Sequence, residues 1–136
     1  MGAWSHEPFG NDAACDWAYG LDERRDFSLV AEAIQNVLDS GTGYLDSDLA
    51  SEAIAATEVL AKALGRGTQT DAYTEKLDTW VKSISAQPSS DLLSNAHTAL
   101  TRILGQDSEL KELWEESDDF GSWESSIKAL QSAVGA

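Results

Sequence analysis

The chain has 136 residues, of which 42% are hydrophobic and 24% charged, and its formal net charge is −15. This length predicts one domain, residues 1–136, whose core needs no metal or disulfide support. The apolar fraction excludes an intrinsically disordered chain. The negative charge excludes nucleic acids and anionic membranes as expected partners, because both would repel it.

The sequence carries no predicted export or membrane signal. Its first residues lack the basic and apolar regions of a secretory signal peptide. The longest alanine-rich stretch, residues 49–64, is too short and too polar to cross a bilayer. We therefore expect a cytoplasmic protein.

Apolar residues recur at helical spacing along almost the whole chain. The stripes cover residues 13–21, 27–38, 49–64, 73–84, 93–104, 110–114 and 120–134. No long segment alternates with the period of two that marks a half-buried strand. These patterns predict an all-α fold: a single compact domain of about six or seven short-to-medium helices, packed antiparallel because the connections are short.

Helix-capping residues lie close to the ends of these stripes. The expected N-caps, whose side-chain oxygens accept free backbone N–H groups of the first turn, are Asn11, Asp48, Ser90, Asp107 and Ser122. The glycines expected to close helix ends in left-handed conformations are Gly41, Gly43, Gly65, Gly67 and Gly105.

The aromatic residues have several expected roles. Trp4 and Phe9 are expected to pack into the helical body, and Trp123 to anchor the C-terminal end. Trp114 has two interpretations. Its spacing from Leu110 favours the core, whereas its position among glutamates is typical of a binding surface.

Both ends of the sequence resemble a known family. Residues 1–4 read Met-Gly-Ala-Trp, Pro-Phe follows at 8–9 and Asn-Asp at 11–12, and an acidic helix contains the pair Leu113-Trp114. This resembles the bacterial domain of unknown function 4259. Its members typically begin Met-Gly-(Ala or Thr)-Trp-Gly-x-Gly-Pro-Phe-x-Asn-Asp. Ser5 and Glu7 depart from that pattern, since glycine is usual there. The resemblance implies a bacterial source and a helical fold, with no established activity and no catalytic residues.

No catalytic or cofactor motif emerges from the sequence. His97 has Ser94 nearby but lacks a nucleophile elbow, so we interpret it as a core or boundary histidine. The only cysteine, Cys15, excludes an intramolecular disulfide and a cysteine-rich zinc site. It has acidic neighbours that should raise its thiol pKa, and we expect a small, partly buried side chain.

The best metal-binding hypothesis comes from the N-terminal segment, where His6 and Glu7 precede Asp12 and Asp16. The two aspartates are four residues apart and share a helix face. Asp12 is explained more simply by the favourable field at a helix N-terminus. We therefore predict no metal, no cofactor and no catalytic residue.

Charge is concentrated in two acidic blocks. Residues 26–61 hold seven acidic and no basic residues, and residues 107–124 hold eight acidic residues against Lys111 alone. The residues expected to contact a partner are Asp39, Asp46, Asp48 and Glu52 in the first block, and Glu112, Trp114, Glu115, Glu116, Asp118 and Asp119 in the second.

Three functional hypotheses follow. The favoured one is a small acidic protein-binding module, an inhibitor or immunity protein that neutralises a basic toxin by blocking its surface. The alternatives are a hydrolase or metal-dependent enzyme with dispersed acidic residues, and a self-associating structural helical domain. The sequence leaves the oligomeric state open.

Overall fold

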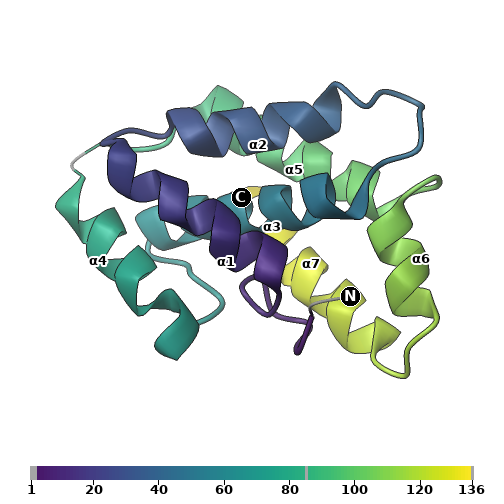
Figure 1. The fold of residues 1–136 in the computed structure, drawn as a ribbon. Helices are drawn as coiled ribbons and strands as arrows, with labels where there is room; N and C mark the ends of the chain where they lie inside the picture. The colour runs from purple at the N-terminus through teal and green to yellow at the C-terminus, as the bar shows by residue number, and fades with distance from the viewer. Residues whose placement is uncertain (1–2, 85, 136) are drawn as a thin grey trace.

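The helical periodicity of the sequence becomes seven α-helices within residues 3–84 and 86–135, the part that this computed structural model describes (Figure 1). They are α1 (Asp12–Ala18), α2 (Ser28–Leu38), α3 (Ser47–Ala63), α4 (Glu75–Ser83), α5 (Ser90–Leu104), α6 (Glu109–Glu115) and α7 (Phe120–Gly135). Short 3-10 helices lie at Tyr19–Glu23 and Ala72–Thr74. The prediction of an all-α fold is confirmed.

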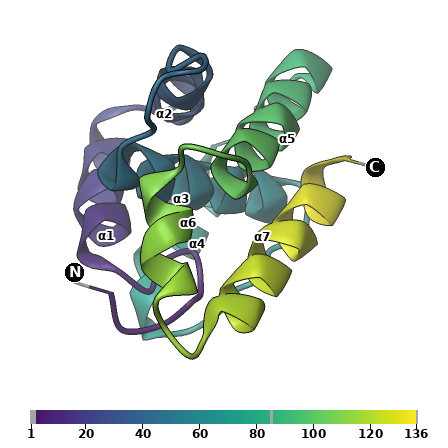
Figure 2. The same ribbon diagram turned by 90° about the vertical axis from the view of Figure 1, so that its right-hand side faces the viewer.

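Helix α3 is the centre of the molecule. It contacts each of the other six helices, and it lies in the middle of the fold in both views (Figures 1 and 2). Its buried alanines, Ala50, Ala53, Ala55, Ala56 and Ala61, have small side chains that let neighbouring helices approach from all sides. One hydrophobic core therefore runs through the whole domain. Across the described residues, no helix is both long and apolar enough to cross a membrane.

The capping predictions are only partly right. Asn11 caps α1 as predicted, since its side chain accepts the N–H of Ala14 at 2.8 Å. Three other helices begin one or two residues earlier or later than predicted: Asp46 caps α3, Ser89 caps α5 and Ser108 precedes α6. Helix α7 already begins at Phe120, so Ser122 lies inside it.

Two of the predicted left-handed glycines are confirmed. Gly41 has a φ of 55° and Gly65 a φ of 76°. Gly105 has a φ of −87°, so the prediction for it is wrong. The left-handed residue after α5 is instead Asp107, with a φ of 56°. Aspartate tolerates this conformation better than most residues other than glycine.

The cap of α1 gives the first testable prediction. Asn11→Ala removes the side-chain oxygen that accepts the N–H of Ala14 and should lower the free energy of unfolding by about 0.5–2 kcal/mol. Chemical denaturation measures the loss. Asn11→Asp is the control, because it keeps an acceptor oxygen at the same place. Equal stability of the alanine variant and the parent would contradict the capping role.

The N-terminal segment folds into a tight loop. The N–H groups of Trp4 and Ser5 both donate to the carbonyl of Gly10, and the N–H of Gly10 donates to that of Glu7. A Cβ at Gly10 would lie 2.7 Å from the carbonyl oxygen of Ser5, so only glycine fits there. Phe9 is buried inside the fold as predicted.

The prediction that Trp4 packs into the helical body is wrong. Trp4 is 47% exposed, and its ring packs against that of Tyr73 with centroids 5.1 Å apart and the ring planes tilted by 37°. Tyr73, which was expected to belong to a core stripe, is exposed as well. The loop closes through its backbone and through Phe9, and Trp4 is left as part of a surface aromatic pair.

Candidate functional site

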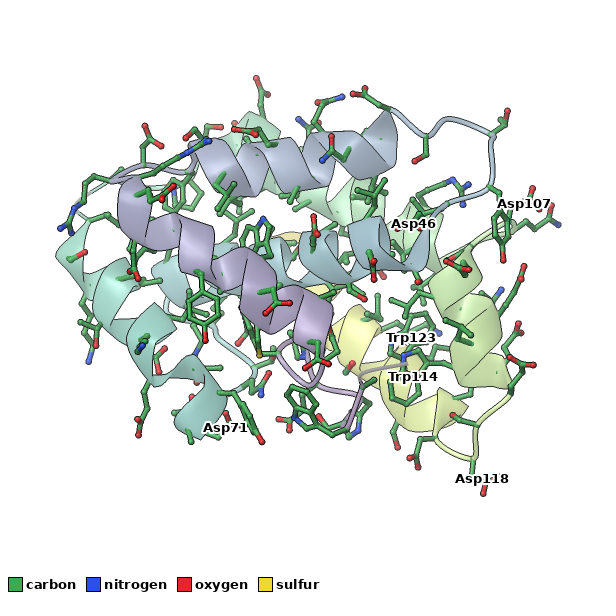
Figure 3. All side chains as sticks on the ribbon, viewed as in Figure 1. Asp46, Asp71, Asp107, Trp114, Asp118 and Trp123 are labelled. Carbon is green, nitrogen blue, oxygen red and sulfur yellow. The ribbon has the colours of Figure 1, made fainter. Side chains whose placement is uncertain are left out.

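The structure brings the part of the first acidic block around Asp46 next to the second block, at one end of the molecule. Leu45, in the loop before α3, forms a parallel bridge with Ser108, in the loop before α6. The N–H of Leu45 donates to the carbonyl of Asp107 at 2.8 Å, and the N–H of Glu109 donates to the carbonyl of Leu45 at 3.0 Å. Asp46 and Asp107 accordingly lie at the same end in Figure 3. Acidic segments about 60 residues apart in sequence thus form one surface.

Side chains strengthen this junction. The carboxylate of Glu109 accepts the N–H of Ser47 at 2.8 Å, at the start of α3. The hydroxyl of Tyr44 donates to Glu112 at 2.7 Å. This hydrogen bond to a carboxylate is the main reason why the pKa of Tyr44 is raised to about 12. Part of the acidic surface therefore holds the two blocks in register.

Within the described residues, no basic side chain forms an ion pair at the acidic end. The guanidinium of Arg102 lies nearby, but it donates to backbone carbonyls, among them those of Gly41 and Gln106. Among the described residues, ion pairs join Arg24 to Glu32, and Lys62 to Glu58 and Asp78, all outside this end. The pKa of Glu52 is raised, first by burial and then by repulsion from the nearby acidic side chains. The acidic side chains of this surface therefore outnumber Lys111 and Arg102 and have no ion-pair partner among the described residues.

The predicted contact residues have different environments. Asp48, Glu115, Glu116, Asp118 and Asp119 are exposed, and Glu52 is half-buried. Asp46 is exposed, although its carboxylate caps α3. Asp39 is exposed at the C-cap of α2, where it accepts a hydrogen bond from Gln35. Trp114 is only 7% exposed, which confirms its core interpretation and removes its ring from the open surface.

A cavity of about 340 Å³ lies beside the acidic junction. Its walls come from the N-terminal loop, α1, the first two turns of α3, helix α6 and Trp123 of α7. Trp114 and Trp123 lie side by side on this wall (Figure 3), with nearly parallel rings whose centroids are 6.4 Å apart. The titratable residues that line it are His6, Glu7, Asp12, Asp16 and Asp48.

This cavity unites residues that sequence reasoning considered separately. Asp12 and Asp16 were considered only for a metal site, and Asp48 only for the acidic surface. In the described parts of the chain, no three histidine, cysteine, aspartate or glutamate side chains come close enough to hold a metal ion. Ser51 and Ile54 of α3 also line the cavity, and no sequence signal marked them.

The remaining candidates for chemistry are separate from this site. His97 is exposed on α5 with its ring against Gly135, so the prediction of a core or boundary histidine is wrong. No hydrogen bond links it to Ser94 in the described structure. Cys15 is partly buried as predicted. Its pKa is raised mainly by burial, and then by Asp12 and Asp16.

The match to a protein family covers almost the entire chain. The model of the domain of unknown function DUF4259 matches residues 2–126. The chain belongs to the DUF4259 family. Comparisons of this DUF4259 chain with curated proteins and with solved structures found no match.

The N-terminal pattern of this DUF4259 chain attaches the N-terminal loop to the rest of the fold through hydrogen bonds. The N–H of the buried Phe9 donates to the side chain of Gln69 at 2.8 Å, and Ser126 of α7 donates to the carbonyl of His6 at 3.0 Å. Ser5, where glycine is usual, uses its hydroxyl to accept the N–H of Glu7 at 3.1 Å. Ala3, Pro8, Asn11 and Asp12 of this pattern line the cavity wall, and so does the C-terminal pair Leu113-Trp114.

Proposed function

We propose that this DUF4259 protein is a binding module whose acidic end engages a basic protein partner. The observation that carries the proposal is the meeting of acidic segments from both blocks at one end, where no described side chain forms an ion pair. Like charges held close together destabilise a fold by a few tenths of a kcal/mol per pair on a helix. A cationic partner would turn that cost into attraction and would accelerate encounter.

Within this proposal, the partner is a bacterial toxin that acts on nucleic acid, and the protein is its cytoplasmic inhibitor or immunity protein. Such a toxin needs a cationic surface to bind a phosphate backbone. An acidic helical surface presents carboxylates in place of phosphates, so it competes for the same contacts. The acidic character and small size of the chain fit this role.

The test uses the product of the gene next to the one that encodes this chain, because toxin and immunity genes are commonly adjacent. Co-expression should yield a complex with a basic partner. The association rate should fall steeply as ionic strength rises from about 0.01 to 0.15 M, where the Debye length shortens from about 30 to about 8 Å. A neighbouring product that forms no complex, or an association rate that ignores salt, would contradict the proposal.

A further inference from the structure

We propose that the 340 Å³ cavity between the N-terminal loop, α1, α3 and α6 is a receptor for one arginine side chain of the partner. This inference rests on the proposed function and names the group that the acidic end recognises. The cavity lies at the small end of the range for ligand sites, about 300–1,000 Å³, which suits a single side chain.

The inner wall of the cavity combines apolar and aromatic side chains with a serine hydroxyl. Ser51 is only 6% exposed and lines the cavity, and its hydroxyl makes no hydrogen bond to any described residue. Solvent or a ligand can reach this hydroxyl through the cavity, since Ser108 Oγ is the described side-chain atom that is both fully buried and without a hydrogen-bond partner. The indoles of Trp114 and Trp123 lie beside it as lining groups. The wall therefore offers aromatic surface and one oxygen that is available to accept a hydrogen bond.

The rest of the lining carries negative charge with no internal counterpart. Glu7, Asp12, Asp16 and Asp48 line the cavity together, and no lysine or arginine does. Within the described residues, none of these four carboxylates has an ion pair or a hydrogen-bond donor. Their charge is thus available to a ligand.

Several backbone N–H groups at the positive ends of the two nearby helices already have acceptors. At α3, the side chain of Asp46 accepts the N–H groups of Asp48 and Leu49, and Glu109 accepts that of Ser47. At α1, Asn11 accepts the N–H of Ala14. These contacts use donors that would otherwise attract an anion, and they leave the carboxylates as the main polar feature of the cavity.

Arginine fits this arrangement better than other cations. Its guanidinium has five donors for several carboxylates and the Ser51 oxygen, and its weak hydration lowers the cost of burial. The planar group also stacks on indole rings. A metal ion lacks a converging ligand set in the described residues. Lysine offers three donors on a strongly hydrated ammonium and fits the apolar wall less well.

The test uses a capped glycine peptide with one central arginine, and a second peptide in which neutral citrulline replaces the arginine. Titrated into the full chain at low salt, the arginine peptide should bind with a Kd on the order of 1 mM, because a single side chain is a small ligand. Binding should shift the indole N–H resonances of Trp114 and Trp123. The citrulline peptide should bind at least about tenfold more weakly, since it lacks the charge.

Matched variants locate the binding. Asp16→Asn with Asp48→Asn removes two charges from the cavity wall and should weaken the arginine peptide about tenfold. Asp22→Asn with Glu75→Gln removes two charges from exposed positions outside the cavity and should change binding by less than about twofold. Ser51→Ala should weaken binding without lowering the melting temperature, since alanine is the better helix former.

Three outcomes would overturn the inference: no shift of either indole, equal binding of the citrulline peptide, or equal losses in the two paired variants. None of them removes the proposed function. If the partner still binds in a salt-dependent way while the arginine peptide does not, the acidic end acts through its open surface alone. If the arginine peptide binds as expected but a neighbouring basic partner does not, the cavity is a cation site and the proposed function fails.

Discussion

Glu58→Ala should lower the free energy of unfolding by about 3–5 kcal/mol. Glu58 lies in the middle of α3 and is fully buried. Its carboxylate accepts the backbone N–H of Thr68 at 2.8 Å, the hydroxyl of Thr68 at 2.7 Å and the N–H of Gln69 at 2.9 Å. Alanine would leave these donors without their acceptor, inside the protein.

The effect should be large because further contacts depend on the same carboxylate. Gln69, which it holds, accepts the N–H of Phe9 and donates to Asp71, so the N-terminal loop and the start of α4 are linked through it. Lys62 donates to the carbonyl of Gln69 at 2.6 Å and pairs with Asp78 of α4 at 2.7 Å. One glutamate thus attaches two surface segments to the central helix.

The matched control is Glu58→Gln, which keeps an acceptor oxygen and should cost only about 1 kcal/mol. Chemical denaturation of both variants measures the difference, and hydrogen exchange at Thr68 and Gln69 shows whether the segment has opened locally. If Glu58→Ala were within about 1 kcal/mol of the parent, the network would not hold the fold together.

The same residue gives a pH dependence. Burial raises the pKa of Glu58, and the hydrogen bonds from Thr68 and Gln69 and the charge of Lys62 offset part of that rise. A carboxyl with a raised folded-state pKa contributes stability that is fully present below its unfolded pKa and is lost as pH rises through the folded value. The side chain in Glu58→Gln does not titrate. Relative to that variant, the parent should therefore gain stability as pH falls from the folded-state pKa of Glu58 to its unfolded-state pKa.

The sequence predicted the helices well and their first residues less well. Apolar periodicity alone determines where a helix can bury a face. Capping residues, however, occur here in runs such as Asp46-Ser47-Asp48 and Ser89-Ser90, and any member of a run can serve as the N-cap. The choice depends on tertiary contacts, such as the Glu109 carboxylate that accepts the N–H of Ser47. The pattern of apolar stripes also underestimates how much of α3 is buried, because a helix buried on every side has no single apolar face.

The candidate site was predictable in its chemistry but not in its geometry. The two acidic blocks are visible in the sequence, yet only the bridge between Leu45 and Ser108 joins them, and neither residue carries a pairing signal. The cavity needs the N-terminal loop, α3 and α6 in one place, which local patterns do not encode. Glu58 gave no signal either, since a glutamate within a helix is usually exposed.

The largest effect on binding is expected from reversing three charges on α6. Glu112, Glu115 and Glu116 are exposed, and replacing all three by lysine should weaken binding of the basic partner at low salt by about a hundredfold or more. Each reversal replaces an attraction by a repulsion, and about 1 kcal/mol per position suffices for that loss. Most of the change should appear in the association rate, because these charges steer the encounter.

The fold should tolerate these substitutions. Lysine is as good a helix former as glutamate, and at positions 115 and 116 a positive charge is favourable near the C-terminal end of α6. Of the described junction contacts, the exposed hydrogen bond between Tyr44 and Glu112 is lost, whereas the Leu45–Ser108 bridge and the hydrogen bond from Ser47 to Glu109 remain. A circular dichroism spectrum like that of the parent would confirm that weaker binding does not result from unfolding.

A second triple variant separates a specific surface from general charge. Asp22, Glu23 and Glu75 are exposed near the 3-10 helix Tyr19–Glu23 and α4, at the end of the molecule opposite α6 (Figure 1). Their replacement by lysine changes the net charge by the same amount as the α6 variant. It should reduce the association rate only slightly, because charges farther than about 10 Å from the contact are screened at moderate salt. If both variants lost affinity equally, the partner would respond to net charge alone, and the acidic end would be only a means of keeping the protein in solution.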